Sequence, residues 1–240
     1  MRTTLPLILC LCAVCTVNAE PREASVSAQK ERALHRLMLS LEEGVVQKKT
    51  LLEVKALKKD KDEGIRIRAI GLLAQYEGEG TGDVKGAIKI LAPYILAEED
   101  AREVKKKILL KRGMKAGFLS SFPAAAQWRQ DYPELLIAMA RLLAFAKEGS
   151  AALAGFNLIG SKHTGIPRAL AAEGRGDMLF AMKNWRNCID SYRLSLKAIG
   201  WMKSRPEYGD GRDLGPIRSR IRRKLNRAQE AHDAERYGPG

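Results

Sequence analysis

The residue types best suited to nucleophilic or metal chemistry are few in this chain and far apart. Cys188 has no histidine near it in the sequence, as an activated thiol would need, so we expect it to be a buried and inert side chain. His35, His163 and His232 are widely separated and lack the spacing of metal ligands. These residues predict neither a catalytic thiol nor a metal site.

Carboxylates could supply acid–base chemistry, but they stand here at expected helix ends and in loops. Examples are Glu42-Glu43, Glu98-Glu99-Asp100 and the stretch from Asp210 to Asp213. Acidic residues in such places complement the helix dipole or solvate a turn. The glycine-rich segment from Gly78 to Gly82 lacks the lysine and the hydroxyl that would grip a phosphate. We therefore expect a protein that is not an enzyme, with no cofactor and no small-molecule substrate.

The strongest charged feature is a basic run near the carboxyl terminus, with no acidic residue between Pro216 and Arg227. Its positive side chains are Arg218, Arg220, Arg222, Arg223, Lys224 and Arg227. A run of this kind is either the solvated face of a terminal helix or a contact for phosphate and carboxylate surfaces. The interleaved aromatic residues of single-strand binders are missing. Both interpretations stay open at this point.

The first residues have the organisation of a secretory signal peptide. Arg2 supplies a positive start, Leu5 to Val17 is an apolar run, and Ala19 ends a stretch suited to cleavage. The run is shorter than the roughly 20 apolar residues of a transmembrane helix, and no later segment qualifies as a span. We expect cleavage near Ala19 and export to the periplasm or beyond the cell. Acylation at Cys15 is the alternative, although Val14 stands where lipoproteins have a small residue.

Cleavage of this leader would leave a strongly basic chain with one cysteine. Cys10, Cys12 and Cys15 would be removed with it, so we expect the fold to be held by packing and not by disulfides. The loss of Arg2 would lower the formal net charge from +14 to +13. An excess of this size favours anionic neighbours, such as acidic lipid head groups, wall polymers, nucleic acid or acidic proteins.

The mature chain has the apolar pattern of an all-α protein. From Glu23 onward apolar residues recur every three or four positions, and no alternating run is long enough to predict a strand. The segment from Ile65 to Ile95 predicts a helical hairpin. A further helix is expected to start at Pro133, with Asp131 as its capping residue.

A helix–turn–helix pattern of small and aromatic residues runs from Ala172 to Gly200. The residues that carry it are Gly176, Leu179, Trp185, Cys188 and Tyr192. This pattern resembles the tetratricopeptide repeat (TPR), which has small residues where its helices touch and aromatic residues beside them. The segment departs from the family pattern at Ala172, where tryptophan is usual, and at Leu179, which replaces an aromatic residue.

A second, degenerate copy of this pattern precedes the first. Shifting the sequence by the family period of about 34 residues places Ala138 on Ala172 and Ala154 on Cys188. We therefore predict two TPR-like hairpins in residues 131–200 that stack as a right-handed α-solenoid of antiparallel hairpins. Residues 20–130 are expected to form degenerate hairpins, TPR-like or HEAT-like, and residues 201–240 a loop and a basic capping helix.

The resemblance implies a groove that holds a protein or peptide segment. The predicted groove residues, from the first helix of each hairpin, are Arg141, Arg175, Asp177 and Met178. This favours a non-catalytic, exported scaffold. The alternative is an envelope adaptor that binds acidic lipid, wall polymer or nucleic acid through the basic helix from Arg218 to Arg227.

Overall fold

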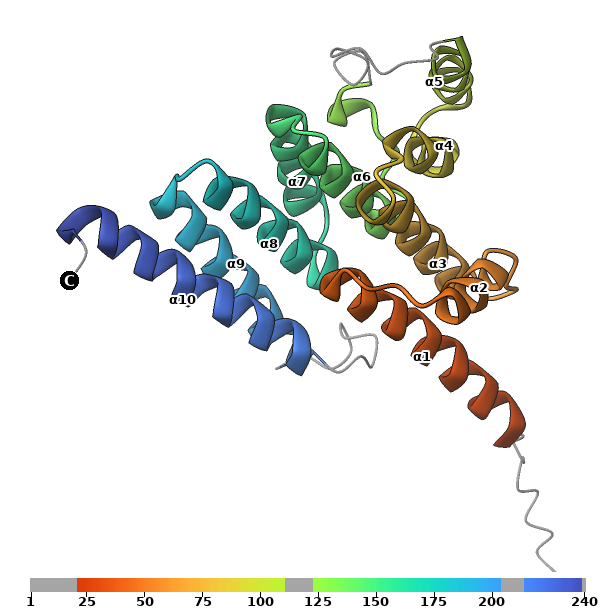
Figure 1. The fold of residues 1–240 in the computed structure, drawn as a ribbon, viewed down its shortest axis with the longest axis horizontal. Coiled ribbons are helices and arrows are strands. Elements are labelled where there is room, and N and C mark those ends of the chain that lie inside the picture. The colour runs from red at the N-terminus through yellow and green to blue at the C-terminus, as the bar shows by residue number, and fades with distance from the viewer. Residues whose placement is uncertain (1–20, 111–122, 204–213, 239–240) are drawn as a thin grey trace, which may run out of the picture.

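The computed structural model describes residues 21–110, 123–203 and 214–238, and Figure 1 shows how they are arranged. Every regular element in these three ranges is a helix and none is a strand, which confirms the predicted all-α class. The helices within them are too short or too polar to cross a membrane. The predicted signal peptide at residues 1–19, Cys15 and the stretch from Asp210 to Asp213 lie outside the described residues.

The first described range consists of helices joined by short turns. They are α1 (Pro21–Glu43), α2 (Lys48–Leu57), α3 (Glu63–Gln75), the π-helical turn η1 (Tyr76–Gly80), α4 (Val84–Ile95) and α5 (Glu98–Leu110). Asp62 caps α3 by accepting a hydrogen bond from the N–H of Ile65 at 3.0 Å. Asp83 caps α4 through the N–H of Gly86 at 2.9 Å. The segment predicted to be a hairpin therefore contains α3 and α4, which contact each other.

The remaining helices follow one another as a stack. They are the short 3₁₀ turn η3 (Ala125–Gln127), α6 (Pro133–Phe145), α7 (Gly149–Lys162), α8 (Gly165–Ala181), α9 (Trp185–Lys203) and α10 (Gly215–Tyr237). Each helix from α6 to α10 packs on the next along the chain, and α8 also contacts α6. Figure 1 shows α7, α8, α9 and α10 lying side by side.

Helix α6 begins at Pro133 as predicted, but its cap differs from the prediction. The N-cap residue is Tyr132, and no side chain accepts a hydrogen bond there. The predicted cap was wrong, because the carboxylate of Asp131 accepts two hydrogen bonds from Arg129, at 3.0 and 2.7 Å. Charge-assisted hydrogen bonds to a guanidinium are stronger than neutral ones to a backbone N–H.

The α6–α7 and α8–α9 turns have the same backbone geometry. Lys147 and Lys183 both adopt a positive φ, of 65° and 55°. The next residue, Glu148 or Asn184, donates its N–H to the carbonyl five residues earlier, at 2.9 Å in both turns. Its own carbonyl accepts the N–H four residues later, at 2.9 and 3.0 Å, which starts the following helix. Equivalent positions of the two hairpins are therefore 36 residues apart, as are Lys147 and Lys183.

This spacing corrects the alignment of the two hairpins by two residues. Cys188 corresponds to Ala152, which is also fully buried, and not to Ala154, which is exposed. Tyr192 corresponds to Phe156, and each of these aromatic side chains is 2% exposed. The shift of about 34 residues was wrong because the buried positions coincide only when the turns coincide.

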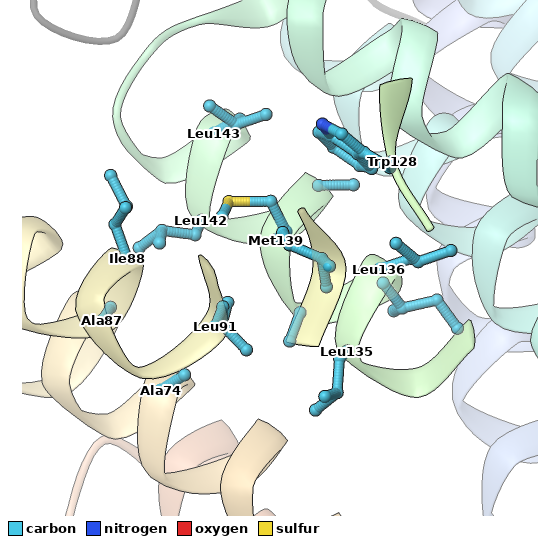
Figure 2. Packing of buried hydrophobic residues seen from close by; sticks show 14 of the residues in the cluster. Ala74, Ala87, Ile88, Leu91, Trp128, Leu135, Leu136, Met139, Leu142 and Leu143 are labelled. Atoms are coloured by element: carbon cyan, nitrogen blue, oxygen red, sulfur yellow. The ribbon is translucent and has the colours of Figure 1, made fainter. Parts of the chain in front are cut away.

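The largest apolar cluster joins the early helices to the stack. Figure 2 shows its centre, where Ile88 and Leu91 of α4 lie against Leu135, Met139 and Leu142 of α6. α6 also contacts α3, so the packing continues across the predicted boundary at residue 131. A second cluster lies between α8, α9 and α10.

Gly176 determines how closely α8 and α9 approach. A Cβ atom at this position would lie 2.5 Å from the ring of Tyr192. That ring cannot move aside cheaply, because it is buried and its hydroxyl donates a hydrogen bond to Asp177. Close packing of this kind requires glycine on the facing helix.

We expect Gly176→Ala to lower the free energy of unfolding by about 1–2 kcal/mol, because overpacking outweighs the gain in helix propensity. Gly160→Ala is the matched control, since a Cβ there meets no atom within 4 Å. Helix propensity alone should make that variant more stable by up to about 1 kcal/mol. Urea unfolding followed by far-ultraviolet circular dichroism measures both variants. If Gly176→Ala and Gly160→Ala had equal free energies of unfolding, the close approach of α8 and α9 at Gly176 would be contradicted.

Candidate binding surfaces

Helix α10 lies along both α8 and α9. Its apolar side, which includes Ile221 and Ala228, joins the cluster between those helices. Arg220 and Lys224 meet α8 at Glu173, and Arg227 meets it further along at Phe180. α10 therefore runs in the same direction as α8. It is antiparallel to α9, because α8 and α9 form a hairpin.

Glu173 of α8 is fully buried and carries most of the contacts to α10. Its two carboxylate oxygens each accept a hydrogen bond from Arg220, at 2.8 Å. The ammonium group of Lys224 donates to the same carboxylate at 2.7 Å. The guanidinium group of Arg141 on α6 lies 3.9 Å from the same carboxylate. One buried carboxylate thus connects α6, α8 and α10.

Asp177, one turn further along α8, extends this cluster. One of its oxygens accepts a hydrogen bond from the Tyr192 hydroxyl at 2.8 Å, and the other from Lys224 at 2.7 Å. Lys224 therefore bridges two carboxylates on α8. We call Glu173, Asp177, Arg220, Lys224 and Arg141 the charge cluster.

The charge cluster keeps Glu173 ionised. Burial alone would raise its pKa, but the nearby charge of Lys224, the hydrogen bonds from Arg220 and the charge of Arg141 outweigh burial. The pKa falls from its ordinary value of 4.5 to about 2. Glu79 in η1 is affected in the opposite direction, because burial raises its pKa more strongly than Arg141 lowers it.

The predicted groove residues do not all face open space. Arg141 and Asp177 belong to the charge cluster, so their charges are used inside the fold. Met178 is half-buried, and its terminal methyl group packs beside Gly149 at the start of α7. Arg175 is half-buried and has no ion-pair partner within the described ranges.

The predicted anion-binding residues divide between two sides of α10. Arg220 and Lys224 point toward α8, in the charge cluster. Arg227 lies over the ring of Phe180, 5.3 Å from its centre. The outward residues are Arg222 and Arg223, which are exposed, and Arg218, which is half-buried.

The residues considered for chemistry lie in unreactive settings. Cys188 is fully buried, and burial raises the pKa of its thiol to about 11 despite a hydrogen bond with Tyr192. His163 lies 3.2 Å from the amide oxygen of Gln130, and burial lowers its pKa. His35 is exposed and lies on α1, far along the chain from the others. Within the ranges that the structure describes, no three possible metal ligands come together.

The sequence did not lead us to predict a role for Glu173, although this residue is central to the charge cluster. It is the one acidic residue between Ile166 and Gly176, within a run of small and apolar residues. An acidic residue in such a run is a sign of a buried charge. Its partner Arg220 could not be found in this way, because it follows 47 positions later.

Comparisons of the chain with protein-family models, with curated proteins and with solved structures give no match. The resemblance to the tetratricopeptide repeat therefore depends on the residues quoted for it.

We expect Glu173→Gln to lower the free energy of unfolding by about 3 kcal/mol at neutral pH, since a pKa of about 2 in place of 4.5 corresponds to that stabilisation. Because the folded-state pKa is lowered, this stabilisation is present above pH 4.5 and is lost as the pH falls toward 2. Urea unfolding of both proteins across this range should show the difference shrinking.

Glu98→Gln is the matched control, because Glu98 pairs with Arg102 on an exposed surface. That substitution should change the stability by less than about 1 kcal/mol. If Glu173→Gln proved equally mild, or its effect did not depend on pH, the charge cluster would not hold α10 in place.

Proposed function

We propose that this chain is an exported, non-catalytic scaffold that binds a protein or peptide partner, built from TPR-like hairpins in a right-handed solenoid. The observation that carries the proposal is the repeated hairpin, because the α6–α7 and α8–α9 turns share their positive φ and their hydrogen bonds. Stacked hairpins expose a long surface with few enclosed spaces, which suits the binding of an extended or helical segment.

The chemistry of the buried polar groups also supports a binding role. Glu173 and Asp177 are occupied by ion pairs with α10, so neither is available as an acid or base. Cys188 carries a protonated thiol at neutral pH, because burial raises its pKa to about 11. Export is supported by the pattern of the first 19 residues.

The partner surface of the scaffold includes Arg175. Of the predicted groove residues, it has no ion-pair partner in the described parts of the chain and keeps some exposure. Arg141 and Asp177 contribute indirectly, because they hold α10 against α8.

The scaffold proposal predicts that the chain from residue 20, immobilised through a tag, retains the same protein repeatedly from an envelope extract. An unrelated exported protein of similar positive charge is the control, because the net charge of +13 that remains without Arg2 retains acidic proteins without specificity. The measurement is the amount of each captured protein on the column with this chain, divided by its amount on the column with the control protein. Identical sets on both columns would show that the chain has no specific protein partner.

A second function, adhesion to an anionic surface, is supported by the outward side of α10. Arg222 and Arg223 are exposed there beside Arg218, and no ion-pair partner accompanies Arg222 or Arg223 in the described ranges. Such a face attracts phosphate and carboxylate groups, with an affinity that falls as salt rises.

The adhesion function predicts that the chain sediments with vesicles of acidic lipid at low salt and is released as the salt rises. The triple variant Arg218→Gln, Arg222→Gln, Arg223→Gln should lose this binding while keeping the charge cluster. Removing Lys105 and Lys106, exposed on α5, is a control for basic charge at another site. Vesicle binding that survives the triple substitution would leave α10 as a terminal cap only.

A further inference from the structure

An open groove separates parts of α9 and α10. Arg186, Ile189, Asp190 and Arg193 of α9 line one side of it. These positions follow the spacing i, i+3, i+4 and i+7, so they form one continuous face over two helical turns. Ile189 is 8% exposed and gives the floor an apolar contact, whereas its three neighbours on this face are exposed and charged.

Helix α10 lines the other side with the same spacing. Its residues in the groove are Gln229, His232, Asp233 and Arg236. The groove is therefore bounded by two helical faces of equal length. Each face extends over about 10.5 Å, the rise of seven residues of α-helix.

The groove has a volume comparable to that of a short helix. Its volume is about 860 Å³, which a cylinder of about 10 Å diameter and about 11 Å length would occupy. Such a cylinder corresponds to about two turns of α-helix with its side chains. Two neighbouring helices that present ridges of side chains over this length provide the surface on which a third helix packs.

One end of the groove is positive. Asp190 lies 3.7 Å from the guanidinium group of Arg193, and Asp233 lies 3.5 Å from the ring of His232, which is charged only when it is protonated. Arg186 and Arg236 have no ion-pair partner in the described residues, although Arg236 stacks on Tyr237 at 5.4 Å. Because α9 and α10 are antiparallel, the start of α9 and the end of α10 point the same way. Their two arginines therefore lie toward the same end.

We propose that the α9–α10 groove binds an acidic, amphipathic helix of a partner protein. The apolar side of that helix would lie on Ile189, and its carboxylates would meet Arg186 and Arg236. A second copy of this chain fits poorly, because two chains of net charge +14 repel each other. This inference depends on the proposed scaffold function and assigns the partner's chemistry and its place.

The test uses the full chain and a synthetic peptide as the probe. The fluorescent peptide forms an amphipathic helix of about four turns, with leucine on one face and glutamate on the flanks. Fluorescence anisotropy should show saturable binding. The double variant Arg186→Glu, Arg236→Glu should weaken it by about tenfold or more, because both carboxylate contacts become repulsive.

The matched control is Lys105→Glu, Lys106→Glu, which changes the net charge equally at an exposed site on α5. It should weaken binding by less than about threefold. A scrambled peptide of the same composition, which cannot segregate its apolar residues, should bind more weakly than the helix. If the control variant is as weak as the groove variant, or both peptides bind alike, the groove does not select a helix and the proposal is wrong.

A cross-linking measurement gives a second readout that does not depend on affinity. A photoreactive group attached at Gln229→Cys, in a chain whose Cys10, Cys12 and Cys15 are changed to serine, should label the peptide, because the native Cys188 is buried and stays unmodified. The same group at Lys197→Cys, on an exposed part of α9 outside the groove, should not. Equal labelling from both positions would overturn the assignment, as would a dimer in solution that the groove variant abolishes.

The envelope experiment separates this inference from the function on which it depends. If the captured partner binds equally to the wild type and to Arg186→Glu, Arg236→Glu, the scaffold function stands and the groove assignment fails. Loss of the partner with the groove variant and its retention with the Lys105→Glu, Lys106→Glu control would support both.

Discussion

A buried carboxylate requires compensation, and the way Glu173 obtains it decides where α10 lies. A shift of α10 by one turn along α8 would move Arg220 and Lys224 away and leave a charge without partners in an apolar interior. The apolar side of α10 alone would tolerate such a shift better, since hydrophobic contacts are not directional. The ion pairs therefore specify position, which is the better-attested effect of buried charges in proteins.

The same requirement gives the basic helix two distinct sides. Its inward cations are paired within the fold, and Arg222 and Arg223 on the outward side are exposed. A count of basic residues in the sequence cannot separate the two, because the difference arises only when Glu173 and Asp177 are placed opposite α10. The groove beside α9 is a third surface, which mixes both charges with an apolar floor.

Local patterns predicted the helices well, and non-local partners account for what was missed. The spacing of apolar residues gave the all-α class and the start of α6 at Pro133, since both depend on neighbours within a few positions. The predicted shift of 34 residues between the two hairpins was obtained by matching residue types. The turns at Lys147 and Lys183 show that equivalent positions are 36 residues apart. The charge cluster was out of reach because its members lie on three helices. The signal peptide, the partner and the anionic surface stay predictions.

The signs of charge alternate along the stack, which restricts how such a chain can lengthen. Arg141 on α6 lies 3.9 Å from the carboxylate of Glu173 on α8, and Arg220 on α10 forms an ion pair with the same carboxylate. A duplicated hairpin inserted after α7 would bring an unmatched sign into the interior unless a compensating substitution arose with it. The number of hairpins between α6 and α10 is thus constrained by electroneutrality as well as by the shape of the helices.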